Sequence, residues 1–149
     1  MELTMGRIVA IDYGRKRVGL AVTDELRMIA TPLGTVHAAE LLAYLKKYVA
    51  GNGVDLFVVG EPKDMQNRPS ESEVYIKPFI ALLGKEFPGI GVVRFDERFT
   101  SMMATRAIRE AGLKKKDRQD KALVDSVSAV IILQSYLESL SGSHQNQIS

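Results

Sequence analysis

Runs of apolar residues predict five β-strands, and their patterning separates buried strands from exposed ones. Residues 8–11 and 57–59 are continuous apolar runs without alternation, which is typical of strands buried on both faces of a sheet. Pro32 in the third predicted strand favours an edge position or a bulge, because proline cannot donate to a central ladder. The predicted strands cover residues 7–12, 17–23, 28–37, 54–60 and 90–95.

Apolar residues at helical spacing predict four helices between and after these strands. A capping box at residues 70–73 marks the start of the second helix, although Pro78 predicts a kink or a later start. Thr100 or Ser101 is placed to cap the third helix. The predicted helices cover residues 38–50, 70–87, 100–111 and 120–140.

The order of these elements predicts an α/β fold. The first three strands form an antiparallel meander, and the last two join it in parallel through right-handed helical crossovers. The result is a mixed five-stranded sheet with helices on both faces. The length of 149 residues suits one domain over residues 1–140. The tail at residues 141–149 has few apolar anchors and is expected to be disordered.

Composition narrows the class of protein. The chain has no cysteine, which excludes disulfides and thiolate metal ligands. No apolar run approaches the roughly 20 residues of a membrane span, and no signal-peptide pattern is present, so a soluble cytoplasmic protein without membrane contact is expected. The net charge of +2 is too small to diagnose nucleic-acid binding. Two local basic clusters, at residues 15–17 and 114–118, could meet phosphates or could be solvated loop charge.

Acidic residues follow three strands that should end at one edge of the sheet. Asp12 closes the first strand, Glu61 closes the fourth, and Glu97 follows the fifth. Ligand sites of parallel α/β sheets lie beyond the carboxyl ends of the strands. Asp125 is the only acid in the apolar part of the last helix. Simpler interpretations are a turn cap for Asp12, a surface acid for Glu61, an ion pair for Glu97 and a helix-dipole contact for Asp125.

Carboxylates that converge on one edge repel each other unless a cation lies between them. Oxygen ligands without histidine or cysteine call for Mg²⁺ or Mn²⁺. One or two such ions can activate water and stabilise the leaving oxygen in phosphodiester cleavage. His37 and His144 have no nucleophilic partner nearby in the sequence, which argues against a serine-type triad.

Three segments, taken in their order along the chain, resemble motifs of the YqgF family, also called the RuvX or Holliday-junction-resolvase family. Residues 11–21 resemble its first motif, residues 96–101 its second, and residues 124–137 its last helix. The resemblance extends over roughly residues 7–138. It implies a ribonuclease H-like fold and a metal-dependent nuclease. Members are described as processing the 5′ end of pre-16S rRNA and were earlier proposed to resolve Holliday junctions.

By motif, the metal-binding acids would be Asp12, Glu97 and Asp125. Glu61 departs from the family pattern, since many members have an apolar residue there. In related resolvases, however, the second acid comes from the end of the fourth strand, where Glu61 stands. Motif matching therefore favours Glu97, whereas the adjacency of the first and fourth strands favours Glu61. The predicted nucleic-acid contacts are Arg15, Lys16, Arg17, Arg98, Lys114, Lys115, Lys116 and Arg118.

Two other classes of function are compatible with parts of this pattern. A binding module with the nuclease fold but little catalysis would lack metal-dependent cleavage. An actin-like kinase also begins with an Asp-x-Gly turn, but it needs a second domain for which this chain is too short. Structured RNA and branched DNA are both polyanions, so the substrate stays open, as does the choice between monomer and homodimer.

Overall fold

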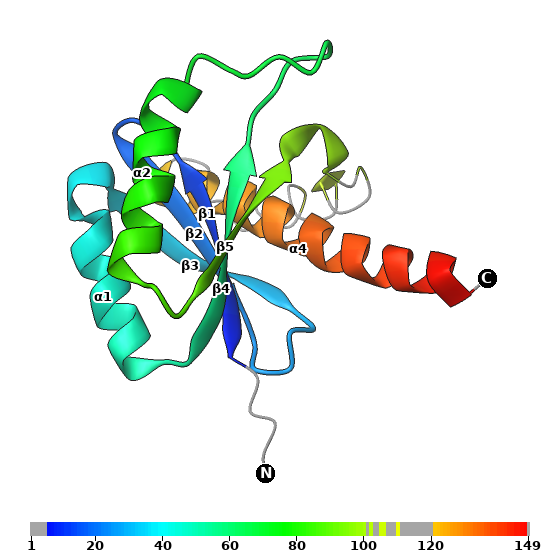
Figure 1. The fold of residues 1–149 in the computed structure, drawn as a ribbon, viewed down its shortest axis with the longest axis horizontal. Coiled ribbons are helices and arrows are strands. Elements are labelled where there is room, and N and C mark those ends of the chain that lie inside the picture. The colour runs from blue at the N-terminus through cyan, green and yellow to red at the C-terminus, as the bar shows by residue number, and fades with distance from the viewer. Residues whose placement is uncertain (1–5, 101, 103–104, 107–109, 111–120, 149) are drawn as a thin grey trace.

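The computed structural model describes residues 6–100, 102, 105–106, 110 and 121–148, with only the backbone described at 121–125 and 142–148. In the described part of the chain, five strands form one sheet, which is flanked by the α-helices α1, α2 and α4 (Figure 1). The strands are β1 (Arg7–Tyr13), β2 (Arg17–Thr23), β3 (Ala30–His37), β4 (Val54–Glu61) and β5 (Gly91–Asp96). The helices are η1 (Ala38–Glu40), α1 (Leu41–Gly51), α2 (Glu73–Glu86), η2 (Glu97–Phe99) and α4 (Lys121–Ile148).

The sheet has the order β3-β2-β1-β4-β5 and is mixed. β2 pairs antiparallel with β1 and β3, while β4 pairs in parallel with β1 and β5. This confirms the predicted α/β class and the expected ribonuclease H-like arrangement. β3 is an edge strand, and its pairing register shifts where Pro32 faces Ala21, as the proline predicts.

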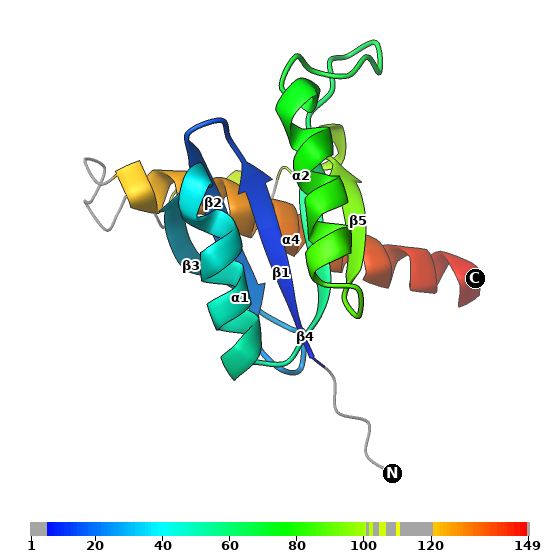
Figure 2. The same cartoon turned by 60° about the vertical axis from the view of Figure 1, so that its left-hand side comes forward.

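The two faces of the sheet carry separate cores. Side chains of β1 alternate between them, so Val9 and Ile11 pack with α1 and α2, whereas Ile8 and Ala10 pack with α4. Figure 2 shows α1 and α2 in front of the sheet and α4 behind it. The alternation decides which face each functional residue reaches at the strand ends.

The helices differ from their predicted bounds for local reasons. α2 begins at Glu73 with Ser72 as its N-cap and no side-chain capping hydrogen bond, so the capping box predicted at residues 70–73 does not form; the Glu73 carboxylate pairs with Arg94 instead. Pro78 lies inside α2 at an exposed position. α4 continues to Ile148, eight residues beyond the predicted end, because extending an existing helix is easier than nucleating one. Most of the predicted helix over 100–111 lies outside the described residues.

Among the described residues, no helix is long and apolar enough to cross a membrane.

Candidate active site

A cleft of about 160 Å³ opens at the carboxyl edge of the sheet, on the face covered by α4. Among the described side chains, two carboxylates line it: Asp12 from the end of β1 and Glu97 from the start of η2. Small, polar and branched side chains complete the lining: Thr100, Thr105, Ser128, Ile131 and Ile132. The structure thus brings together two of the acids that the sequence singles out.

Asp12 reaches this cleft because of the alternation of β1. Ala10 packs against α4, so Asp12, two residues later, lies on the same face where the strand leaves the core. Ser128 of α4 lines the cleft opposite and is small enough for the helix to lie close. A central strand held on both sides is a rigid support for a functional carboxylate.

Gly60 makes room for Glu97 beside Asp12. Val59 pairs with Ile11, so Gly60 follows next to Asp12 on the side of the sheet covered by α4. A Cβ atom at residue 60 would lie 2.5 Å from Oε2 of Glu97 and 2.9 Å from Cδ1 of Ile132. The carboxylate of Glu97 therefore occupies the space that a side chain from β4 would fill.

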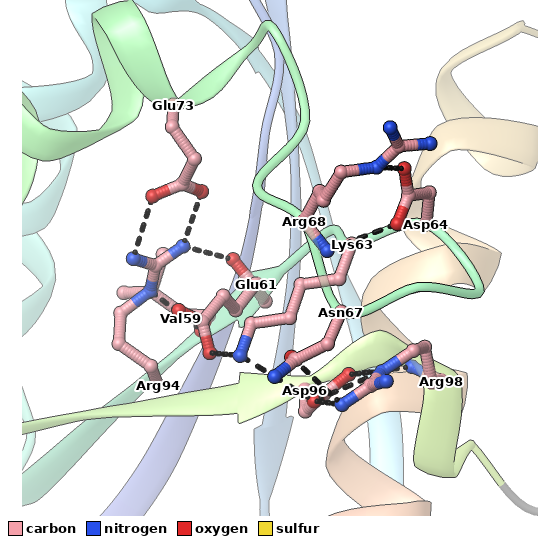
Figure 3. Close-up of polar contacts among 11 residues, drawn as sticks. Val59, Glu61, Lys63, Asp64, Asn67, Arg68, Glu73, Arg94, Asp96 and Arg98 are labelled. Atoms are coloured by element: carbon pink, nitrogen blue, oxygen red, sulfur yellow. Dashed lines mark hydrogen bonds and ion pairs between the residues drawn. The ribbon is translucent and has the colours of Figure 1, made fainter.

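Glu61 does not line the cleft. It is one residue beyond Gly60 in β4, and successive side chains of a strand point to opposite faces. Its carboxylate lies 3.7 Å from Nζ of Lys63 (Figure 3). Strand adjacency alone therefore does not bring Glu61 to the described cleft: β4 does lie next to β1, but the position beside Asp12 is Gly60. The structure places Glu97 with Asp12, as motif matching favours.

Asp96 anchors the turn that carries Glu97. Its carboxylate accepts a hydrogen bond from the backbone N–H of Arg98 at 3.0 Å and one from the Arg98 guanidinium at 2.7 Å. Hydrogen bonding to Arg98 lowers the pKa of Asp96 to about 2. Lys63 lies 3.7 Å from the same carboxylate, and Arg98 also donates to Asn67 (Figure 3). Arg98, a predicted phosphate contact, thus has its guanidinium engaged within the protein.

A partly buried ion pair fixes the end of β4 from the other face of the sheet. The Arg94 guanidinium donates to both carboxylate oxygens of Glu73, at 2.9 and 3.1 Å, and to the carbonyl oxygen of Gly60 at 2.8 Å (Figure 3). The Glu73 side chain is only 8% exposed, and the pair lowers its pKa. β5, the end of β4 and the start of α2 are tied together at one point.

We expect Arg94→Ala to destabilise the protein by roughly 3 kcal/mol, because it leaves the Glu73 carboxylate desolvated and unpaired. Arg68→Ala is the matched control, since Arg68 forms an exposed pair with Asp64 and its loss should change stability by about 0.5 kcal/mol or less. Urea denaturation at neutral pH measures both. Equal effects of the two changes would show that the Arg94 pair is no more than a surface contact.

Glu97 is the titrating group of the cleft. Burial, and then the negative charge of Asp12, raise its pKa from 4.5 to about 7, against the opposing effect of Arg94. The negative charge of Asp12 thus opposes ionisation of Glu97 near neutral pH. A cation bound between the two carboxylates would reduce this repulsion. The donor set is hard oxygen, so the described part of the cleft fits a divalent ion such as Mg²⁺.

The pKa of Glu97 predicts how pH changes the stability of the metal-free protein. Because the folded-state pKa is raised, stability from this group is fully present below about pH 4.5 and is lost as pH rises through about 7. Glu97→Gln should therefore stabilise the protein by roughly 2 kcal/mol at about pH 8 and little at about pH 4. Urea denaturation in EDTA at both pH values tests this. Glu61→Gln is the control, and an equal gain at both pH values would contradict the assignment.

The remaining predicted residues are placed as follows. The backbone of residue 125 lies in α4, about one turn before Ser128, but the structure does not describe the side chain of Asp125. Within the described residues, no group of three acidic, histidine or cysteine side chains is close enough to hold a metal ion. Arg15, Lys16 and Arg17 are exposed at the turn that follows β1, on the same edge as the cleft. Lys114, Lys115, Lys116 and Arg118 lie outside the described residues.

Comparison with known proteins identifies the family. A family model described as "RuvX: Holliday junction resolvase" matches residues 6–139. The chain is 57% identical over 135 residues to a protein of Parabacteroides distasonis, covering 91% of this chain and 96% of the relative. It is 58% identical over 134 residues to one of Porphyromonas gingivalis, covering 90% and 97%. Both relatives are called "Putative pre-16S rRNA nuclease".

Among solved structures, Archaeoglobus fulgidus Pelota matches with a TM-score of 0.39 and 11% identity, covering 60% of this chain and 26% of that one. A likeness this weak carries no argument about fold or function. The family model and the relatives do, because they match nearly the whole chain. This chain belongs to the RuvX family.

Proposed function

We propose that this protein is a metal-dependent nuclease that hydrolyses phosphodiester bonds in processing the 5′ end of pre-16S rRNA. The observation that carries the proposal is the pairing of Asp12 and Glu97 in one cleft at the carboxyl edge of the sheet. The names of the relatives from Parabacteroides distasonis and Porphyromonas gingivalis support pre-16S rRNA as the substrate. Membership of the RuvX family supports nucleic acid as the substrate class.

Asp12 and Glu97 would hold Mg²⁺ or Mn²⁺, with Asp125 as the third acid implied by the family motif. Such an ion supplies activation of water and stabilisation of negative charge on the leaving oxygen. Titration of the metal-free protein with Mn²⁺ would measure whether one or two ions bind. Since Glu97 must lose its proton to act as a ligand, the affinity should rise as pH passes through about 7.

The protein's own groups supply position and charge. β1 holds Asp12 rigidly, and the turn capped by Asp96 holds Glu97 against Gly60. The exposed residues Arg15 and Lys16 lie at the same edge, where phosphates of the substrate would approach. Cations at such positions fix the register of a strand without reading its bases.

One experiment tests the proposal against its alternatives. The protein is incubated with a precursor 16S fragment and with a four-way DNA junction, each with and without Mn²⁺, and every cut is mapped. We expect Mn²⁺-dependent cuts at the 5′ side of the RNA. Binding without cleavage of either substrate would identify a non-catalytic module instead.

Resolution of Holliday junctions is the second candidate, favoured because the matching family model is described as a Holliday junction resolvase. It would require symmetric cuts in two strands and therefore a homodimer. Cleavage of the junction with the RNA left intact would favour this function. Light scattering of the protein, alone and with the junction, would show whether a dimer forms.

The basic cluster at residues 114–118 is proposed to hold the substrate backbone. Replacing Lys114, Lys115, Lys116 and Arg118 with serine should weaken binding to RNA and DNA alike. If the cluster neutralises about three or four phosphates, the slope of log affinity against log salt should fall by a similar number. Filter binding over a salt series measures this, and an unchanged slope would show that the cluster is only a solvated connector.

A further inference from the structure

Phe99 presents an exposed aromatic ring in the short helix η2, which also carries Glu97 of the candidate active site. It is the last residue of η2, two positions after Glu97, and it is 68% exposed. Single exposed apolar side chains are common on protein surfaces and need no explanation by themselves. Phe99 differs because its position is fixed by the turn that also fixes an acid of the cleft.

Contacts on one side of the ring hold it in place. The Arg98 guanidinium lies over the ring, 5.5 Å from its centroid, a geometry in which cation and ring attract each other. Arg98 is itself held by Asp96 and by Asn67, at 2.7 and 3.1 Å. The ring is therefore a preorganised surface, and its large exposed fraction leaves area for another flat group.

We propose that Phe99 is a stacking platform for an unpaired nucleobase of the strand to be cut. The proposal rests on the proposed nuclease function and adds to it that the substrate is single-stranded beside the scissile phosphate. Every base has a flat face, so stacking on an aromatic ring holds a strand with little regard to its sequence. In a duplex these faces are covered by neighbouring base pairs, so the platform selects an unpaired base.

The location of Phe99 matches this role. The ring and Glu97 belong to the same turn of three residues, so a base on the ring places its own backbone near the cleft. The guanidinium of Arg98 is paired with Asp96 and serves to position Phe99 rather than to neutralise a phosphate. Phosphate contacts would fall to the exposed cations of the β1–β2 turn.

Binding in EDTA, where no strand is cut, tests the proposal. The probes are a short single-stranded RNA, the same strand with abasic nucleotides that keep every phosphate, and a blunt RNA duplex. We expect the wild-type protein to bind the intact strand about tenfold more tightly than the abasic strand. Phe99→Ala should remove that preference and leave affinity for the abasic strand unchanged. Leu26→Ala is the control, because Leu26 is 70% exposed at the opposite edge of the sheet.

Phe99→Trp gives a direct readout, since the chain contains no tryptophan. We expect this variant to keep the preference for the intact strand, and its indole fluorescence to be quenched by that strand but not by the abasic one. Three results would overturn the inference alone: equal weakening of both strands by Phe99→Ala, unquenched fluorescence, or duplex binding that depends on Phe99. Failure of the wild-type protein to bind any probe, or the precursor RNA, would overturn the nuclease proposal as well.

Discussion

Asp12→Asn is expected to abolish metal-dependent cleavage while leaving the protein folded. Asparagine is nearly isosteric with aspartate, but it removes the carboxylate charge that lies with Glu97 in the cleft. Asp12 is proposed as a direct metal ligand, and loss of such a ligand should reduce the rate by more than the roughly 10–100-fold that follows loss of an outer-shell partner. Cleavage of the precursor RNA with Mn²⁺ measures the effect.

The same substitution should hold or raise stability in the absence of metal. The charge of Asp12 opposes ionisation of Glu97, so its removal relieves repulsion and lowers the pKa of Glu97 from about 7. Thermal denaturation in EDTA supplies this control and separates a catalytic loss from unfolding. Undiminished cleavage by Asp12→Asn would refute the role of Asp12. Lost activity with a lower melting temperature would instead indicate structural damage.

The fold follows from the sequence because its signals are redundant. The continuous apolar runs at residues 8–11 and 57–59 mark the two central strands, and these residues are buried in the structure. The strand order then follows from the element order and the handedness of crossovers. The bounds of α2 and α4 are harder to predict: α2 begins without the side-chain cap that the sequence offers, and α4 extends beyond its last apolar positions.

The site was predictable only to the level of the sheet edge. The strand ends and the family motif predict that Asp12 and Glu97 lie close together. The choice between Glu61 and Glu97, however, depends on which residues of β4 face α4. One residue of register moves every side chain to the other face. A glycine at the end of a strand was the available signal, because it marks a close approach by another group.

The contacts around Arg94 gave no comparable signal. Arg94 and Glu73 are 21 residues apart, and nothing in their local sequence links them. The pair forms because β5 and the first turn of α2 meet in the folded protein. Interactions of this kind become visible only in three dimensions.

Gly60→Ala is expected to remove most of the cleavage activity although no catalytic group is changed. The added Cβ would lie 2.5 Å from Oε2 of Glu97 and 2.9 Å from Ile132, closer than nonbonded atoms approach, so one of them must move. The Oε2 atom is at the end of the flexible Glu97 side chain, whereas Ile132 is buried where α4 packs against the sheet. The carboxylate should therefore move away from Asp12, and displacement by about 1 Å is enough to cost roughly 10²-fold in rate.

Gly84→Ala is the matched control for this prediction. It makes the same chemical change at an exposed position of α2 where a Cβ meets nothing within 4 Å. Alanine in a helix interior should stabilise the protein by about 0.5–1 kcal/mol, and activity should be unchanged. Gly60→Ala should also weaken Mn²⁺ binding, measured by calorimetry, because the two carboxylates no longer converge. Normal Mn²⁺ affinity and normal cleavage in this variant would show that the glycine at residue 60 does not position Glu97.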